Sequence, residues 1–330
     1  MNFITAATVQ KDDAGKRADK IFRIVLGKMP LSRIYKEIRS GFLRINGKKT
    51  KEDAKVSEGD TVDVAQILME FAVQEPKRQT THAVNRENFR NRIIFEDSDI
   101  LVINKKKGEL VHSDNTSRRF TPLDQLVREY LAPEMASSIS FSPGPLHRLD
   151  RNTSGIIAFG KSASGARLFS EALQHRETRK CYIALLDGKL TKKETWEDYL
   201  LRDEATNTSC VTKRGDTNGA LAMTIASPFL ISGGMTLAQV EIKTGRTHQI
   251  RCQASFHHHP LSGDAKYHGS HNQKGYLLHS CCIIAQGRTI TGSPGAEFIA
   301  EAAERMGCTV AEVKTATEAI ISSFVKENTV

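Results

Sequence analysis

The sequence predicts an α+β protein in which a small helix-helix-hairpin domain precedes a mixed, mainly antiparallel sheet with flanking helices. After residue 93 the predicted strands outnumber the helices and mostly follow one another along the chain, whereas strict strand-helix alternation would indicate a parallel sheet. The first 71 residues carry helix and hairpin signals of their own. With 330 residues and 39% hydrophobic side chains, the chain is long and apolar enough to bury more than one core.

The first domain is expected to span residues 11–71 and to begin with two helices. Between residues 16 and 28 the apolar side chains fall on one helical face. Ser32 is positioned to cap a second helix that continues through Arg39. Gly41 is expected to end that helix, because glycine readily takes the left-handed conformation found at helix termini.

A β-hairpin is expected to follow these helices. Two strands are predicted at 42–45 and 61–64, and Asn46-Gly47 is a strong turn signal. Residues 72–92 are polar and basic with no apolar periodicity, which is typical of a linker.

The second domain is expected to span residues 93–295. Its strands are predicted from short apolar runs bounded by turn residues, at 93–95, 100–104, 155–159, 179–186, 221–226 and 235–242. One helix is predicted over 122–131 and another from a Ser162 cap to His175. Three apolar side chains of this last helix should face the sheet, namely Leu168, Phe169 and Leu173.

The last segment, 296–330, predicts a helical extension. Gly307 should separate two helices, with Thr309 capping the second. Nothing in this segment points to chemistry, and we expect it to serve packing alone.

The overall charge favours a polyanionic partner. Lys and Arg number 47 against 38 Asp and Glu, a net charge of +9, and the pI is near 9.2. Nucleic acid is the first expectation and a membrane surface the second. No apolar run approaches the roughly 20 residues that span a bilayer, and residues 1–10 lack the apolar core of a signal peptide. We therefore expect a cytoplasmic monomer with no membrane partner.

Much of the positive charge lies in the first domain. Residues 11–60 contain 14 Lys and Arg but 8 Asp and Glu, so this segment carries +6 of the +9. Six basic side chains are expected to form one patch over the second helix and the hairpin, namely Arg33, Lys36, Arg39, Arg44, Lys48 and Lys49. The alternative is an ordinary solvated helix face.

The cysteines and histidines do not predict a metal site. None of the six cysteines belongs to a Cys-x-x-Cys pair, so buried, reduced thiols are expected. The stretch 257–279 is rich in histidine, but it lacks the ligand spacing and acidic partner of a catalytic zinc site. We expect no metal, and the sequence offers no account of these histidines.

The strongest candidate for chemistry is the stretch 145–160, where a polar loop enters an apolar strand. Asp150 lies between Arg148 and Arg151 in this loop. Nearby positive charge favours the ionised form of a carboxylate, which suits a nucleophile or a base better than an acid. The alternative is a salt-bridged structural aspartate, which is common for an isolated Arg-x-Asp.

A second polar loop, 243–251, also enters an apolar segment. It carries Arg246, His248 and Arg251, more functional side chains than a turn requires.

Four stretches together resemble the RluA-type pseudouridine synthases, and they span about residues 93–295. They are His147-Arg-Leu-Asp-Arg-Asn-Thr-Ser-Gly155, Lys180-Cys-Tyr-Ile-Ala184, Gly245-Arg-Thr-His-Gln-Ile-Arg251 and Gly263-Asp-Ala-Lys-Tyr267. The first is highly specific, and each of the others is moderately so. Residues 11–71 similarly resemble the alpha-L RNA-binding module first named from a ribosomal protein. The combination is similar to family members that modify large-subunit ribosomal RNA.

The resemblance implies roles for individual side chains. Asp150 is implied to be the catalytic aspartate, which attacks the sugar or the base or accepts a proton from the sugar. Arg251 is implied to pair with Asp150, and Tyr182 to stack on the target base and to handle a proton. Arg148 is implied to fill the space left when the nucleotide leaves its stack or to hold phosphate. His147, Arg246 and His248 are expected to contact RNA, and no cofactor is implied.

The chain departs from the family pattern at two places. It has Lys105-Lys106 where the family usually has Lys-Pro, and Asn152 where an aspartate is usual. The first should loosen a loop and the second should weaken one turn contact.

Four other functions are compatible with parts of the sequence. They are a non-catalytic RNA-binding assembly factor, a synthase acting on transfer RNA, a metal-dependent hydrolase using the histidines and a nucleoside glycosidase. An ordinary glycosidase needs two carboxylates, and no second one accompanies Asp150.

Overall fold

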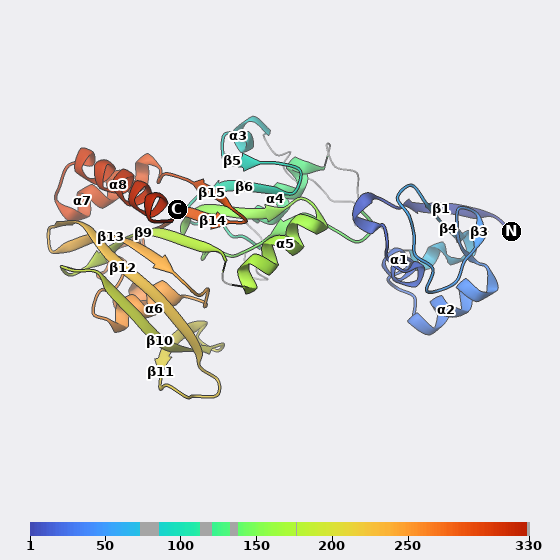
Figure 1. The fold of residues 1–330 in the computed structure, drawn as a ribbon, viewed down its shortest axis with the longest axis horizontal. Helices are drawn as coiled ribbons and strands as arrows, with labels where there is room; N and C mark the ends of the chain where they lie inside the picture. Colours follow the sequence, from blue (N-terminus) through green and yellow to red (C-terminus); the bar gives the residue numbers. More distant parts are fainter. Residues whose placement is uncertain (73–85, 113–120, 133–137, 176, 329–330) are drawn as a thin grey trace.

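The computed structural model describes residues 1–72, 86–112, 121–132, 138–175 and 177–328. Most of the predicted linker lies outside these ranges. A small N-terminal sheet stands at one end of an elongated molecule, and a large sheet with the C-terminal helices forms the remainder (Figure 1). Within the described ranges, every helix falls short of the length and apolarity that a membrane span requires.

The N-terminal unit is a four-stranded sheet in the order β1-β4-β2-β3, packed against two helices. Its elements are β1 (Phe3–Thr8), η1 (Lys11–Asp13), α1 (Ala18–Val25), α2 (Leu31–Ser40), β2 (Leu43–Ile45), β3 (Lys48–Lys49), β4 (Thr61–Ala65) and η2 (Gln66–Phe71). The predicted helices and hairpin are confirmed. β1 is an addition, because it pairs with β4 and begins before the expected domain start at residue 11. Its sequence gives a weak strand signal because this edge strand is only half buried and contains a bulge.

The two ends of α2 differ in how well the sequence predicted them. Gly41 ends the helix in the left-handed conformation, with a φ of 81°. Ser32 is not the cap, because the helix already begins at Leu31 after Pro30 and no side chain caps it. Proline has no N–H to satisfy and its φ already suits a helix start.

The large sheet has the order β11-β10-β12-β13-β9-β14-β8-β6-β5, with β15 on β14 and β7 on β8. Its strands are β5 (Ile93–Glu96), β6 (Ile100–Lys105), β7 (Gly144–Pro145), β8 (Ser154–Gly160), β9 (Arg179–Asp187), β10 (Glu194–Asp203), β11 (Thr208–Thr212), β12 (Ala220–Ser232), β13 (Met235–Ile242), β14 (Leu278–Ala285) and β15 (Arg288–Thr291). Its helices are α3 (Arg86–Arg90), α4 (Leu123–Leu131), α5 (Ala163–Gln174), α6 (Gln249–Phe256), η3 (Ala265–Tyr267), α7 (Ala296–Met306) and α8 (Val310–Asn328). All pairs are antiparallel except β8 with β14, so the predicted mixed, mainly antiparallel sheet is confirmed.

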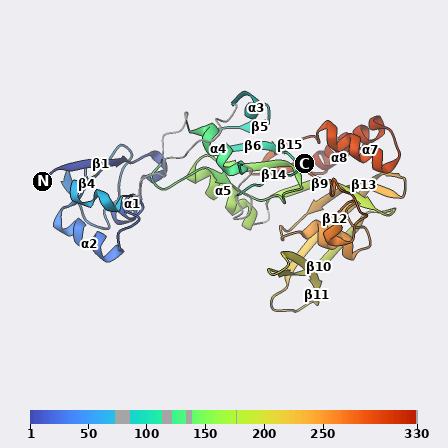
Figure 2. The same cartoon turned by 180° about the vertical axis from the view of Figure 1, so that it is seen from behind.

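Side chains of β9 alternate between two cores. Tyr182 and Ala184 belong to one core, whereas Cys181 and Ile183 belong to the other. The second core is completed by α7 and α8, which lie over β9, β13 and β14 (Figures 1 and 2). The C-terminal extension therefore closes one face of the sheet, and the other face is left for the site described below.

The helix α5 begins as predicted, since the Ser162 hydroxyl accepts a hydrogen bond from Gly165 N–H at 2.9 Å. Phe169 and Leu173 pack into a core with β6, β8 and β14. Leu168 was predicted to face the sheet, but it is 49% exposed. Leu168 precedes Phe169 by one residue and is therefore rotated from it by about 100° around the helix, toward solvent.

The parallel contact between β8 and β14 requires a glycine. Gly155 has a φ of 112°, and a Cβ there would lie 2.2 Å from the Ser280 carbonyl oxygen. Only glycine permits the two backbones to approach this closely. This contact fixes the end of the loop that carries Asp150.

Asp13 joins the N-terminal unit to the large-sheet domain. Its carboxylate is fully buried and accepts hydrogen bonds from Ser138 Oγ at 2.8 Å and from the N–H groups of Ile139 and Ser140 at 2.9 Å each. Burial alone would raise the pKa of Asp13, but the hydrogen bonds outweigh it and the pKa lies below its ordinary value. The carboxylate therefore stays charged at neutral pH and holds the 138–140 segment.

Replacing Asp13 with alanine is expected to loosen this contact. The change leaves buried donors without an acceptor, at a cost of about 1–3 kcal/mol. Small-angle scattering should then show a broader distribution of intramolecular distances than in the unaltered protein. The exposed Asp53→Ala provides a control of the same chemistry, and identical scattering from both variants would rule out the role of Asp13.

Candidate active site

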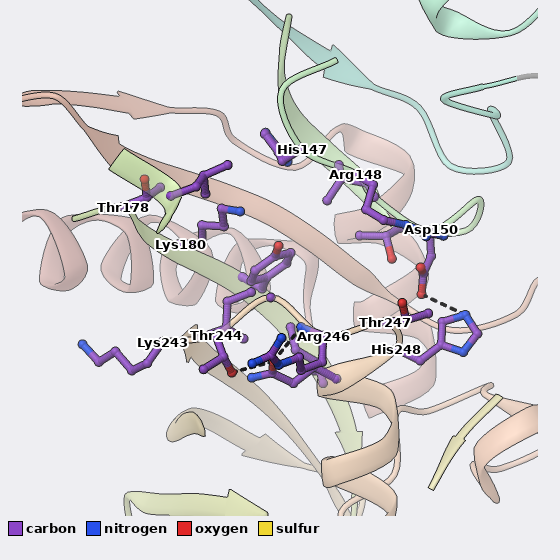
Figure 3. A pocket seen from close by; sticks show the side chains of 18 of the residues that line it. His147, Arg148, Asp150, Thr178, Lys180, Lys243, Thr244, Arg246, Thr247 and His248 are labelled. Atoms are coloured by element: carbon purple, nitrogen blue, oxygen red, sulfur yellow. Dashed lines mark hydrogen bonds and ion pairs between the residues drawn. The ribbon is translucent and has the colours of Figure 1, made fainter. Parts of the chain in front are cut away.

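A pocket of about 540 Å³ opens on the face of the large sheet that α7 and α8 leave uncovered. Three segments far apart in the sequence line it, namely the 146–153 loop, the start of β9 and the 243–251 loop (Figure 3). The two polar loops singled out from the sequence therefore meet. Such a volume is typical of sites that enclose a small ligand or one residue of a larger one.

Asp150 and Arg251 face each other in this pocket. The Arg251 Nη1 atom lies 3.4 Å from Asp150 Oδ2. Arg251 also donates two hydrogen bonds to the buried carboxylate of Asp264, at 2.7 Å and 2.8 Å. Its guanidinium lies over the rings of Tyr267 and Tyr276, with distances of 4.9 Å and 4.6 Å to the ring centres. Arg251 is thus fixed on all sides, and it holds Asp150 through the remaining nitrogen.

His248 is the second group that approaches Asp150, with its Nε2 atom 3.7 Å from Oδ2 (Figure 3). The Tyr267 hydroxyl accepts a hydrogen bond from Ser209 N–H and lies 2.9 Å from His248 Nδ1. Because His248 Nε2 faces the Asp150 carboxylate, which can only accept, the tautomer with its proton on Nε2 satisfies both contacts, with Tyr267 donating to Nδ1. Burial lowers the pKa of His248, although the charge of Asp150 opposes the shift, and the ring is neutral at neutral pH.

Lys105 fixes the backbone of the loop that carries Asp150. Its side chain is fully buried, and its ammonium donates to the carbonyl oxygens of Asp150 at 3.2 Å, Arg151 at 2.9 Å and Thr153 at 2.7 Å. Burial lowers the pKa of Lys105 to about 8, so the group is still largely protonated at neutral pH. In the sequence, Lys105 stood out only as the lysine of the family's Lys-Pro motif, and no role was predicted for it.

Tyr182 lines the same pocket from β9 and is 6% exposed. Burial raises its pKa, and the charge of Asp150 raises it further. Tyr182 therefore stays protonated at neutral pH, where its hydroxyl can donate a hydrogen bond and its ring offers an apolar surface. Because its pKa is raised, it gives up its proton poorly. The geometry thus favours stacking on a base over the proton handling that was also predicted.

The cations that flank Asp150 in the sequence are not its partners in space. Arg151 donates instead to the Gly108 carbonyl at 3.1 Å. Arg148 is exposed and lines the pocket with no ion pair to Asp150 among the described residues. Consecutive side chains of a loop point in different directions, so the prediction that Arg148 and Arg151 surround the carboxylate was wrong.

His147 and Arg246 also line the pocket, and the RNA contacts expected of them stay predictions. Arg246 is exposed and donates to the Leu221 carbonyl at 3.0 Å. Asp264, Tyr267 and Tyr276 were not predicted as site residues. Asp264 and Tyr267 belong to the motif Gly263–Tyr267, which was the available signal, whereas no motif contains Tyr276.

The six predicted basic residues lie on the N-terminal unit and do not line the pocket. Lys36, Arg39, Lys48 and Lys49 are exposed. Arg33 lies over the Phe71 ring and pairs with Glu37 at 3.5 Å. The remaining residue of the set, Arg44, is held by the carbonyls of the Gly41–Gly47 segment and by the Phe3 ring.

Two of the six histidines in the histidine-rich stretch are held by hydrogen bonds to the protein, whereas His259 Nδ1 is buried without a hydrogen-bond partner among the described residues. His257 stacks on Trp196 and bonds to Asp198 at 3.0 Å. His279 is buried between Ser154 and the Gly292 carbonyl. Within the described residues, no three His, Cys, Asp or Glu side chains gather closely enough to hold a metal ion. The cysteines are free thiols, of which Cys210 is exposed against expectation.

Comparison with known proteins gives a consistent result. A sequence model of the family "RNA pseudouridylate synthase" matches residues 99–256. The ribosomal large subunit pseudouridine synthase C of Vibrio vulnificus is 30% identical over 261 residues, covering 78% of this chain and 78% of the relative. The protein of the same name from Escherichia coli K12 is 29% identical over 270 residues, 80% of each chain.

A solved structure shares the fold. Human RNA Pseudouridylate Synthase Domain Containing 4 has a TM-score of 0.56 and 17% sequence identity, and covers 68% of this chain and 96% of that chain. Sequence relatives and fold thus agree with the motifs that meet in the pocket. The chain belongs to the RNA pseudouridylate synthase family, in its RluA-type branch, and is an RNA pseudouridine synthase.

Proposed function

We propose that this enzyme isomerises specific uridines of large-subunit ribosomal RNA and that Asp150 is its catalytic residue. The relatives are ribosomal large subunit pseudouridine synthases, and this supports the RNA class. The observation that supports the residue is the meeting of Asp150 with Arg251 in the pocket, at 3.4 Å. The carboxylate is 18% exposed there, so it is open to a ligand yet held by the guanidinium.

The chemistry requires the target uridine to leave its stack, which costs a few kcal/mol. The pocket then receives the nucleoside, with Tyr182 stacking on the base and Asp150 acting on the sugar or the base. His248, Arg246 and Arg148 contact the surrounding RNA, and Arg148 fills the vacated position. The protein acts as a monomer and needs no cofactor in this scheme.

The N-terminal unit acts as an alpha-L RNA-binding module that gives affinity without reading sequence. Its exposed lysines attract phosphate, and each phosphate contact adds to the salt dependence of binding. The linker at 72–92, the catalytic domain at 93–295 and the extension at 296–330 complete the proposed domain division.

Removing charge from this module is expected to flatten the salt dependence of RNA binding. The triple variant Lys36→Gln, Lys48→Gln and Lys49→Gln should reduce the slope of log affinity against log salt by about 2 to 3. The control variant changes three exposed lysines of the β9–β10 connection, namely Lys189, Lys192 and Lys193. Equal slopes in the two variants, measured by filter binding, would remove the module from the proposal.

The proposed substrate class is tested by incubating the purified protein with unmodified transcripts. Pseudouridine measured by nucleoside mass spectrometry should appear in large-subunit RNA and remain absent from transfer RNA. Product in transfer RNA alone would favour the alternative synthase. Binding without product in either RNA would favour a non-catalytic assembly factor.

A further inference from the structure

Three polar groups without hydrogen-bond partners line one part of the pocket. Thr178 Oγ1 and His147 Nδ1 are buried without a partner, and Lys180 Nζ has no hydrogen bond or ion pair within the described part of the chain. Figure 3 shows all three side chains on the opposite side of the pocket from His248. Unsatisfied buried polar groups are rare in folded proteins, and a group of them beside a cavity points to a ligand.

Lys180 is the charged member of this group. It lies two residues before Tyr182 on β9, so both side chains point to the same side of the strand. Burial lowers the pKa of Lys180 to about 8, and no carboxylate offsets that effect. This differs from Arg251, whose charge is balanced by Asp264 and Asp150. Lys180 is half-buried, so water still reaches its ammonium in the open pocket, and a bound anion would replace that water and supply the missing counter-charge.

His147 is a neutral donor. Its Nε2 atom accepts a hydrogen bond from Ala158 N–H at 3.1 Å, so the ring proton must reside on Nδ1. Burial and the nearby charge of Lys180 lower the pKa of His147 far below its ordinary value, and a backbone hydrogen bond with Arg148 offsets them only in part. The ring stays neutral, and the contact of Nδ1 with the Arg148 backbone falls outside good hydrogen-bond geometry, so this N–H can still turn to a ligand.

The ligand that matches one cation and two neutral donors is an anionic oxygen. We propose that Lys180, Thr178 and His147 form a phosphate subsite that binds a backbone phosphate next to the target uridine. This inference rests on the proposed function, because it takes RNA as the occupant of the pocket. A uracil carbonyl would use the neutral donors but would leave the ammonium without a counter-charge, whereas a phosphodiester satisfies all three.

The subsite predicts proton uptake on RNA binding. A bound phosphate favours the ammonium and therefore raises the pKa of Lys180 above its free value of about 8. At pH 8 about half of the free enzyme lacks this proton, so binding takes up protons. At pH 6.5 the lysine is already charged, and the uptake should vanish.

The test uses the full-length protein and an RNA hairpin with the sequence of part of the large-subunit transcript. The hairpin contains one uridine that the enzyme converts, in its unmodified form. Calorimetry at pH 8 in buffers of different ionisation enthalpy measures proton uptake for the wild type, Lys180→Met and Lys180→Arg. Lys243→Met is the charge-matched comparison, since Lys243 also lines the pocket but pairs with Glu241. Uptake should be unchanged in Lys243→Met and should fall by about half a proton per molecule in both Lys180 variants, with Lys180→Arg retaining most of the affinity.

A second arm first locates the phosphate with the wild-type protein and then asks whether the effect depends on Lys180. Neutral methylphosphonate replaces each phosphate flanking the uridine in turn. At one of the two positions the methylphosphonate should weaken RNA binding by the wild type about tenfold. The same replacement should leave the RNA affinity of Lys180→Met almost unchanged, because this variant already lacks the ammonium. An equal penalty in both proteins, or proton uptake by Lys180→Met equal to that of the wild type, would overturn the subsite. Failure of the wild type to modify the hairpin's parent RNA would instead refute the proposed function.

Discussion

Replacing Asp150 with asparagine is expected to lower turnover by at least about a thousandfold while leaving RNA affinity within about threefold. Asparagine keeps the shape of the side chain and can still accept a hydrogen bond from Arg251. It carries no negative charge, so it can neither attack the nucleoside nor accept a proton. Single-turnover assays with excess enzyme would measure the chemical step, and filter binding would measure affinity.

The matched control is Asp203→Asn, which makes the same substitution at an exposed turn. It should leave turnover unchanged. Activity of Asp150→Asn within a few-fold of this control would show that the carboxylate has no part in the chemistry.

Replacing Arg251 with methionine is expected to affect both stability and turnover. The change leaves the carboxylate of Asp264, whose side chain is 2% exposed, without its two hydrogen bonds. Removing one partner of a buried ion pair typically costs about 3–5 kcal/mol. Turnover should fall by at least about a hundredfold, because Asp150 loses the group that holds it. Urea unfolding and single-turnover assays report the two effects separately.

A double variant separates positioning from folding. Adding Asp264→Leu to Arg251→Met removes the unpaired buried charge and should restore most of the lost stability. It should not restore turnover, since Asp150 still lacks the guanidinium. Recovery of activity together with stability would mean that Arg251 serves the fold alone.

The sequence predicted strands where apolar runs are continuous and missed β10 and β14, in which polar side chains interrupt the apolar run, although β14 is buried over most of its length. β6, β8 and β9 are buried over most of their length and were located to within one or two residues. β10 is charged along one side, and its pattern resembles a surface loop. Its place in the sheet is set by pairing with β12, which no local signal reveals.

The site was predictable where its groups belong to short specific motifs. Asp150 and Arg251 were paired on that basis, across 101 positions of the chain. The contacts of Lys105 with the loop and of Asp264 with Arg251 depend on how the sheet brings distant segments together. Arg148 and Arg151 were wrongly expected to surround the Asp150 carboxylate because they are close to it in the sequence. Closeness along a loop does not determine which side chains point toward one another.

The most direct test of the account is a structure of the Asp150→Asn variant bound to its large-subunit RNA substrate. The account predicts a uridine turned out of its stack into the pocket, with its ring against Tyr182 and its sugar or base within about 3.5 Å of residue 150. A complex in which the substrate uridine stays stacked, or binds outside the pocket between the 146–153 and 243–251 loops, would contradict it.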